Sequence, residues 1–346
     1  MKRLYGARPR VAAWLLAVAV ALVAVGARVV RADPSPSLPP VSPQELLTSS
    51  LDALARPYTI SGDVSTTIDL GLPELPSSIG GAGGPLSLVI GRQHYKVWHS
   101  PGGVRLAHIL DFAEQDLVAN SNGAWLWDSS SMTAVHLSYP PDAAPPSQAS
   151  APSTADITSM ARAALEAVRP YATIAVGGTG WVAGRPVYRL VLTPTSSLTR
   201  VGEIVAAIDA ETRLPLDVQA IPRGTDRPAI EAGFTSVSFD PIDASMFTFT
   251  PPPGATVHQA AALRRAPGDE SPMPSISPSE VRLFGSGFDL RVAYRLDAPL
   301  PKQTAALLPY SGSLASVIAV DRGDVTWILA GFVDISTLQN DANSLP

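Results

Sequence analysis

The stretch ISGDVSTTIDL (residues 60–70) sets the fold class. Every even position in it is apolar, small or threonine, and every odd position is polar. Strict alternation of this kind predicts a β-strand with one buried face and one face in water. We therefore expect Ile60, Val64 and Ile68 to point together into an apolar interior.

Short strands continue outward from this stretch at intervals of about ten residues, a rhythm typical of an antiparallel meander. The expected strands before the middle of the chain lie near 86–98, 103–110, 115–120, 124–128 and 132–138. Those after it lie near 172–176, 181–183, 186–193, 203–209, 215–221 and 229–239. The sequence thus predicts a main sheet of about eleven strands.

Two amphipathic helices accompany this sheet. The first begins with Ser42 as N-cap, Pro43 at the first helical position and Glu45 two residues later, and Pro57 ends it. The second is expected over 155–169, where an apolar stripe with helical spacing includes Met160 and Leu165.

Proline-rich stretches divide the chain. We expect a linker over 33–42, a main domain over 43–257 and a second linker over 258–278, the whole of 251–278 being irregular. A C-terminal α+β extension over 279–346 should then pack on the main domain, because its strands have apolar faces that need cover. Within it we expect strands near 281–285, 288–296, 314–320 and 325–332 and a short helix at about 301–308.

Two helices of this length cannot cover a flat sheet of about eleven strands. The fold class predicted is therefore α+β, with a large antiparallel sheet that curls around the helices. An incompletely filled curved sheet is a site for an apolar ligand. Trp125 and Trp127 lie two apart on one strand and share a face, so they either fill the core or line that cavity. The predicted lining is Ile60, Val64, Ile68, Trp125, Trp127, Met160 and Leu165.

The first 32 residues form an export signal. Six basic and no acidic residues lie there, and four of the bases precede a wholly apolar run from Val11 to Ala27. The residues around Ala32 fit a signal-peptidase site, but the run is also near the length that spans a bilayer. Cleavage after Ala32 and retention as an anchor over 11–30 both remain open. In either case residues 33–346 should work outside the cytoplasm.

Composition excludes several function classes. The chain has 346 residues and no cysteine, which rules out disulfides, thiolate metal sites and a thiol nucleophile. Beyond residue 32 only 19 basic residues face 30 acidic ones, a poor match to nucleic acid. The five histidines show no metal-binding spacing, and His94 and His99 should face opposite sides of one strand. Asp209 and Glu211 form a carboxylate pair on an expected tight turn, where solvation is favoured over acid–base catalysis.

Several blocks together resemble the LolA/LppX/RseB superfamily in its actinobacterial form, the outer-membrane lipoprotein carrier protein LolA-like group. The blocks are DLGLP (69–73), GAWLWDS (123–129), VYRLVLTP (187–194), AIDAETRLPL (207–216) and FTFTPPPGA (247–255). The resemblance covers about residues 43–257. It implies a curved, open antiparallel β half-barrel plugged by helices, which binds acyl chains of lipids or lipoproteins. It implies no cofactor. The segment 279–346 is absent from the founding carrier of the superfamily.

Three functions follow as hypotheses. The first is an extracytoplasmic carrier for lipid or lipoprotein acyl chains. The second is an envelope sensor of the RseB kind, which acts through a membrane-protein partner, an anti-sigma factor. The third, an extracytoplasmic hydrolase, lacks any visible nucleophile–base pair, so we expect no enzymatic activity. The predicted partners are acyl chains and a membrane protein, with no nucleic acid, cofactor or metal.

Overall fold

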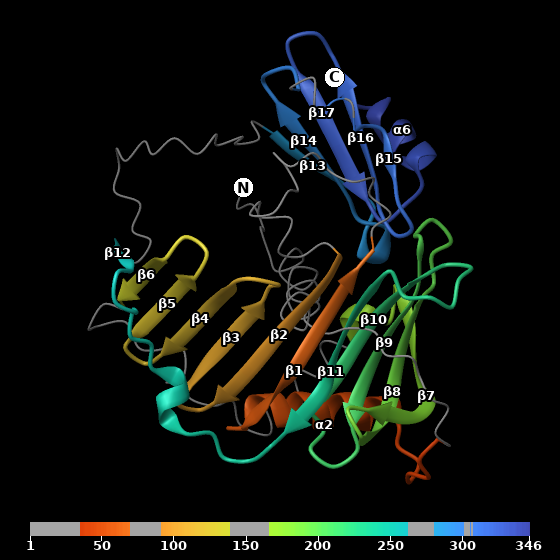
Figure 1. The fold of residues 1–346 in the computed structure, drawn as a ribbon. Helices are drawn as coiled ribbons and strands as arrows, with labels where there is room; N and C mark the ends of the chain where they lie inside the picture. Colours follow the sequence, from red (N-terminus) through yellow and green to blue (C-terminus); the bar gives the residue numbers. More distant parts are fainter. Residues whose placement is uncertain (1–34, 70–90, 139–165, 262–279, 301–304, 306) are drawn as a thin grey trace, which may run out of the picture.

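The computed structural model describes residues 35–69, 91–138, 166–261, 280–300, 305 and 307–346. Within these residues the chain forms a twelve-stranded sheet and a separate five-stranded sheet (Figure 1). The predicted export signal over 1–32 and most of the expected helix 155–169 lie outside the described residues, as does most of the expected helix near 301–308. Residues 166–168 are helical.

The large sheet is open and strongly curved, and the predicted α+β half-barrel is confirmed. Its strand order is β12-β6-β5-β4-β3-β2-β1-β11-β10-β9-β8-β7. β7 contacts β11 although three strands separate them in this order, which shows how tightly this half of the sheet curls. The first strands are β1 (Ile60–Ile68), β2 (Gly91–Ser100), β3 (Gly103–Ile109), β4 (Glu114–Asn120), β5 (Gly123–Asp128) and β6 (Thr133–Ser138). The later ones are β7 (Ala172–Val182), β8 (Arg185–Pro194), β9 (Val201–Asp209), β10 (Pro215–Pro222), β11 (Ile230–Ser238) and β12 (Thr256–Ala261).

Two features of the sheet differ from the sequence analysis. β12 lies in the segment expected to be irregular, and it pairs with β6 in parallel, the one parallel pair among the described strands. The segments expected near 172–176 and 181–183 form a single strand, β7, whose register shifts between Val176 and Thr179. The prediction that 251–278 is irregular is therefore wrong for residues 256–261.

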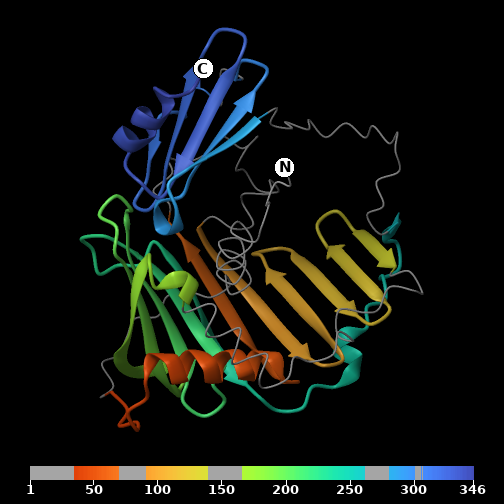
Figure 2. The same cartoon turned by 180° about the vertical axis from the view of Figure 1, so that it is seen from behind.

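The helix α2 (Pro43–Ala55) begins as predicted. The hydroxyl of Ser42 accepts a hydrogen bond from the backbone N–H of Glu45 at 3.1 Å, and Pro43 occupies the first helical turn, where its missing N–H is not needed. Figure 2 shows α2 lying along one end of the sheet. Its residue Leu46 is fully buried against Tyr188, Leu190 and Ile208 of β8 and β9.

The second sheet has its own core. It is formed by β13 (Glu280–Phe284), β14 (Arg291–Leu296), β15 (Tyr310–Ser311), β16 (Ser316–Asp321) and β17 (Thr326–Gly331). The helix α6 (Ile335–Ala342), which the sequence analysis missed, covers one face with Leu338 against Trp327 and Leu329. Two hydrogen bonds from the guanidinium of Arg291 to Asp341, at 2.6 and 3.0 Å, fix α6 to the sheet.

The two sheets touch through a small apolar cluster and several polar contacts. Leu314 is buried between Val201 and Ala229 of the large-sheet region. Thr199 forms an isolated β-bridge with Val333. Beside it, the guanidinium of Arg200 donates to the hydroxyl of Ser311 at 2.7 Å.

Candidate functional site

The candidate site is a row of five apolar side chains that crosses the β2–β6 half of the large sheet. Each is the direct partner of the next across neighbouring strands, so all five point to the same face. The row consists of Val97, Leu106, Leu117, Leu126 and Val135. We call these five residues the apolar row.

The apolar row is only partly covered. Leu126 is 45% exposed, and the other four are partly exposed. None of the five belongs to, or packs against, a hydrophobic core cluster in the part of the chain that the structure describes. Five strands spaced about 4.8 Å apart make this row roughly 19 Å long. The sheet thus presents a narrow apolar track of that length.

A polar network borders the row on the same face. The imidazole Nε2 of His108 lies 2.9 Å from the amide oxygen of Gln93, and the amide of Gln115 donates to Asp128 at 3.0 Å. Burial lowers the pKa of His108, and a hydrogen bond with Gln115 only partly opposes this effect. His108 is therefore neutral at pH 7. The border offers amide, imidazole and carboxylate groups that largely satisfy one another.

The strand β1 continues the same face. Gly62 is the partner of Val97, and Ile60, Val64 and Ile68 lie on the Gly62 side of the strand. Ile60 and Val64 are buried, and Ile60 packs in a cluster with Leu54 of α2. The predicted residues of β1 therefore lie beside the apolar row, but Ile60 is a core residue under the helix.

Trp125 and Trp127 lie on the opposite face, so the expectation that they line one space with Val64 is wrong. They flank Leu126 along β5, and alternation turns them away from the apolar row. Trp125 stacks on His136 with ring centroids 4.1 Å apart. Both indoles lie against Phe249, with centroids 5.5 and 5.8 Å away. Of the two readings left open, this packing favours core filling.

A short 3₁₀ helix, η2 (Ala244–Phe247), covers the Trp-bearing face nearby. Phe247 is buried, and its carbonyl accepts a hydrogen bond from the amide of Asn120 at 2.8 Å. A Cβ on Gly103 would come within 2.9 Å of the Phe247 side chain. The two faces of the β2–β6 half therefore differ: one is packed under η2 and Phe249, and the other carries the apolar row.

Met160 and Leu165, the other two predicted lining residues, lie outside the described residues. The apolar row itself was not predicted from the sequence, although Leu117 and Leu126 each stand in an apolar stretch. In DLVA (116–119) and AWLW (124–127) apolar residues occupy both faces. The alternation of apolar and polar residues therefore did not distinguish the two faces of β4 and β5.

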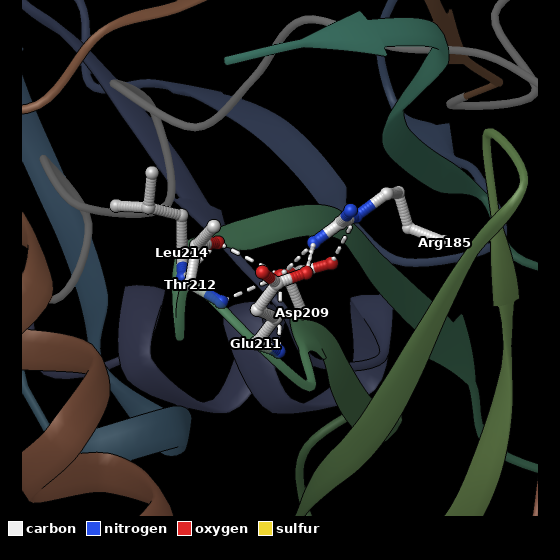
Figure 3. Close-up of polar contacts among 5 residues, drawn as sticks. All are labelled: Arg185, Asp209, Glu211, Thr212 and Leu214. Atoms are coloured by element: carbon white, nitrogen blue, oxygen red, sulfur yellow. Dashed lines mark hydrogen bonds and ion pairs between the residues drawn. The ribbon is translucent and has the colours of Figure 1, made fainter.

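The turn with the carboxylate pair is a structural clasp (Figure 3). Contrary to the expectation of a solvated turn, Asp209 is fully buried. It accepts hydrogen bonds from Nε and Nη2 of Arg185 at 2.8 and 2.9 Å and from the backbone N–H of Thr212 at 2.7 Å. Burial alone would raise the pKa of Asp209, but the hydrogen bonds from Arg185 and Thr212 outweigh it and lower the pKa. Asp209 is therefore an ionised anchor with its bonds already made.

His94 and His99 face opposite sides of β2, as predicted, because they pair with Ser65 and Ile60 of β1. In the described ranges no three histidine, aspartate or glutamate side chains gather in a way that could hold a metal ion. None of the helices in those ranges is long and apolar enough to cross a membrane.

No family model matches the chain, and no curated protein matches it. Solved structures do match. The Pseudomonas aeruginosa MucA/MucB complex aligns over 86% of this chain and 96% of that chain, with 14% identity and a TM-score of 0.47. LprF from Mycobacterium bovis aligns over 64% and 100%, with 12% identity and a TM-score of 0.30. A LolA superfamily protein from Nitrosomonas europaea aligns over 86% and 96%, with 8% identity and a TM-score of 0.19.

The protein from Nitrosomonas europaea bears the name of the superfamily that the sequence blocks resemble. Likenesses of this strength say nothing about what this chain binds, so the function has to be inferred from its own residues.

Proposed function

We propose that this chain binds the acyl chain of a lipid or lipoprotein outside the cytoplasm and carries it along the apolar row. The observation that carries the proposal is the partly exposed row of five directly paired apolar side chains on one sheet face. An extended hydrocarbon chain is the ligand whose shape fits a narrow apolar track of roughly 19 Å.

The energetics support a chain of this kind. Each buried CH₂ group contributes about 0.8 kcal/mol, so a long acyl chain offsets the cost of association. The row itself has no hydrogen-bonding side chain, and the bordering groups His108, Gln93 and Gln115 are engaged with one another or with Asp128. A sugar or a nucleotide would need free hydrogen-bond donors at the row. Because the row has none of its own, an acyl chain suits it better.

The test uses a fluorescent fatty-acyl probe and two exposed leucines. Leu126→Asp places a carboxylate in the middle of the row and should abolish probe binding. Leu283→Asp changes a residue that is 58% exposed on the second sheet and should leave probe binding unchanged. Circular dichroism verifies that both variants fold. Equal binding by Leu126→Asp and the unmodified chain would contradict the proposal, as would the absence of lipid in native mass spectra of chain purified from its own host.

A second candidate function is the sensor, which acts through a membrane-protein partner such as an anti-sigma factor. The observation that favours it is the face of the second sheet opposite α6. Val281 and Tyr294 are directly paired there and are 49% and 40% exposed, and Leu283 lies beside them. If Leu283→Asp abolishes capture of a membrane protein in the native host while probe binding by the row is absent in the unmodified chain, the sensor replaces the carrier.

A further inference from the structure

The turn between β3 and β4 brings three exposed large apolar side chains together within four residues. Phe112 is 103% exposed, and Ile109 and Leu110 are 40% and 38% exposed. The turn is well formed, since the backbone N–H of Leu110 donates to the carbonyl of Ala113 at 2.9 Å. Exposed aromatic and aliphatic side chains at the tip of an ordered hairpin mark an interaction site.

This turn belongs to the hairpin that carries the centre of the apolar row. Leu106 on β3 and Leu117 on β4 are direct partners, and each lies three residues from the end of its strand at the turn. At about 3.3 Å per residue, the ends of the two strands are therefore about 10 Å from the row, and the tip of the turn lies just beyond them. The neighbouring β5–β6 turn lies at the same end, since the backbone N–H of Ser129 donates to the carbonyl of Glu114. It adds Met132, which is 40% exposed.

We propose that the turn Ile109–Ala113 inserts Phe112 into the surface of a lipid bilayer, so that an acyl chain passes between the membrane and the apolar row. This inference rests on the proposed function and names the surface from which that ligand comes.

The size of the turn favours a bilayer over a protein partner. A stable protein interface buries about 800 Å² on each partner, whereas one aromatic side chain buries about 150–250 Å². Five residues at a convex tip do not reach the area that a second copy or another protein needs. A bilayer accepts a single apolar side chain without a complementary socket.

The charges near the tip indicate which membrane surface fits. Asp111 is the charged residue of the turn, and the nearest acidic strand residue, Glu114, is paired with Arg105 at 3.7 Å. The tip thus lacks a cluster of cations that would attract anionic lipids. Insertion should occur in neutral phosphatidylcholine, and anionic lipid should not strengthen it.

The experiment uses the full chain reconstituted with phosphatidylcholine vesicles. Because the chain has no cysteine, Asp111→Cys provides a unique position for a polarity-sensitive fluorophore. The matched control is Ser121→Cys, an exposed position in the turn at the opposite end of β4. The label at 111 should shift its emission to the blue and be quenched by brominated acyl chains, and the label at 121 should do neither. Adding Phe112→Ser to Asp111→Cys should remove both effects.

Two further measurements separate this inference from the proposed function. Phe112→Ser should retain binding of the soluble acyl probe but lose transfer of that probe to vesicles, whereas Leu126→Asp should lose probe binding and keep the blue shift at position 111. Identical spectra at 111 and 121, or a blue shift that persists after Phe112→Ser, would overturn the membrane contact. Failure of the unmodified chain to bind the probe would overturn the carrier function instead.

Discussion

The large sheet has one face that runs through both of its halves, but what covers that face differs between β7–β11 and β2–β6. In the β7–β11 half, that face packs against Leu46 of α2 at one end and against Leu314 of the second sheet at the other. In the β2–β6 half, the continuation of the face carries the apolar row, which joins no core cluster of the described residues. One continuous sheet thus has a closed half, which forms the buried core, and an open half, which we propose as the binding surface.

The largest effect should come from the closed half. Leu46→Ala removes a fully buried side chain from contact with Tyr188, Leu190 and Ile208, and it should lower the free energy of unfolding by about 3 kcal/mol. Chemical denaturation measures this change. A loss below about 1 kcal/mol would show that α2 is not what closes this half.

The second-largest loss of stability should come from a change in the clasp at the end of β9. Asp209→Asn keeps the shape of the side chain but leaves Arg185 without its buried charged partner, and it should lower the free energy of unfolding by about 2 kcal/mol at pH 7. The pKa of Asp209 is lowered in the folded state, so its stabilisation is present above the unfolded pKa of about 3.9 and is lost as pH falls below it. Denaturation curves of the two chains should therefore converge in acid; a constant difference would contradict the assignment.

A smaller effect of the opposite sign is expected at Asp217, on the other face of the closed half. Burial, together with the nearby charge of Glu231, raises the pKa of Asp217 to about 7, against the opposing effects of Arg189 and Gln219. The folded state therefore binds an extra proton between pH 4 and 7, and stability falls as pH rises through that range. Asp217→Asn should be more stable than the unmodified chain at pH 8 by about 2 kcal/mol or less.

Asp217→Asn and the unmodified chain should be equally stable near pH 4, where both side chains are neutral. Urea denaturation at the two pH values makes the comparison. A variant that is less stable than the unmodified chain at pH 8 would show that the ionised carboxylate is stabilising.

The smallest effect on stability should come from the open half. Leu126→Ala removes a side chain that is 45% exposed and outside the described core clusters, so the free energy of unfolding should change by about 0.5 kcal/mol or less. Binding of an acyl probe should nevertheless weaken measurably. A loss of stability as large as that of Leu46→Ala would show that Leu126 is packed as tightly as the core of the closed half.

Much of the fold was predictable because local signals determine it. The alternation in 60–70 predicted β1, and Ser42 with Pro43 predicted the start of α2. β12 escaped prediction because its place in the sheet depends on a partner, β6, that lies more than one hundred residues earlier in the chain. The helix α6 is short and mostly polar, and its two buried residues, Leu338 and Ala342, leave little periodic signal.

The site was only partly predictable for a related reason. Alternation identifies which residues of one strand share a face, but it does not relate the faces of different strands. Pairing alone places Leu126 with Leu117 and turns the two tryptophans away. Asp209 was expected to be solvated because its partner, Arg185, stands on another strand. The sequence of the turn gives no sign of this ion pair.

The pairing of β1 has a consequence for the order in which the emerging chain can complete its sheet. β1 joins β2 within the first hundred residues, but its other neighbour is β11, with Asp63 bonded to Ser236 across 173 residues. As the chain emerges from its N-terminal end, β1–β6 can assemble as a local meander while both outer edges remain unpaired. β11 then joins β1 on one side, and β12 joins β6 on the other. The β2–β6 half can therefore form first, and until β11 and β12 arrive we expect its unpaired edges to be the part of the emerging chain most exposed to edge-to-edge aggregation.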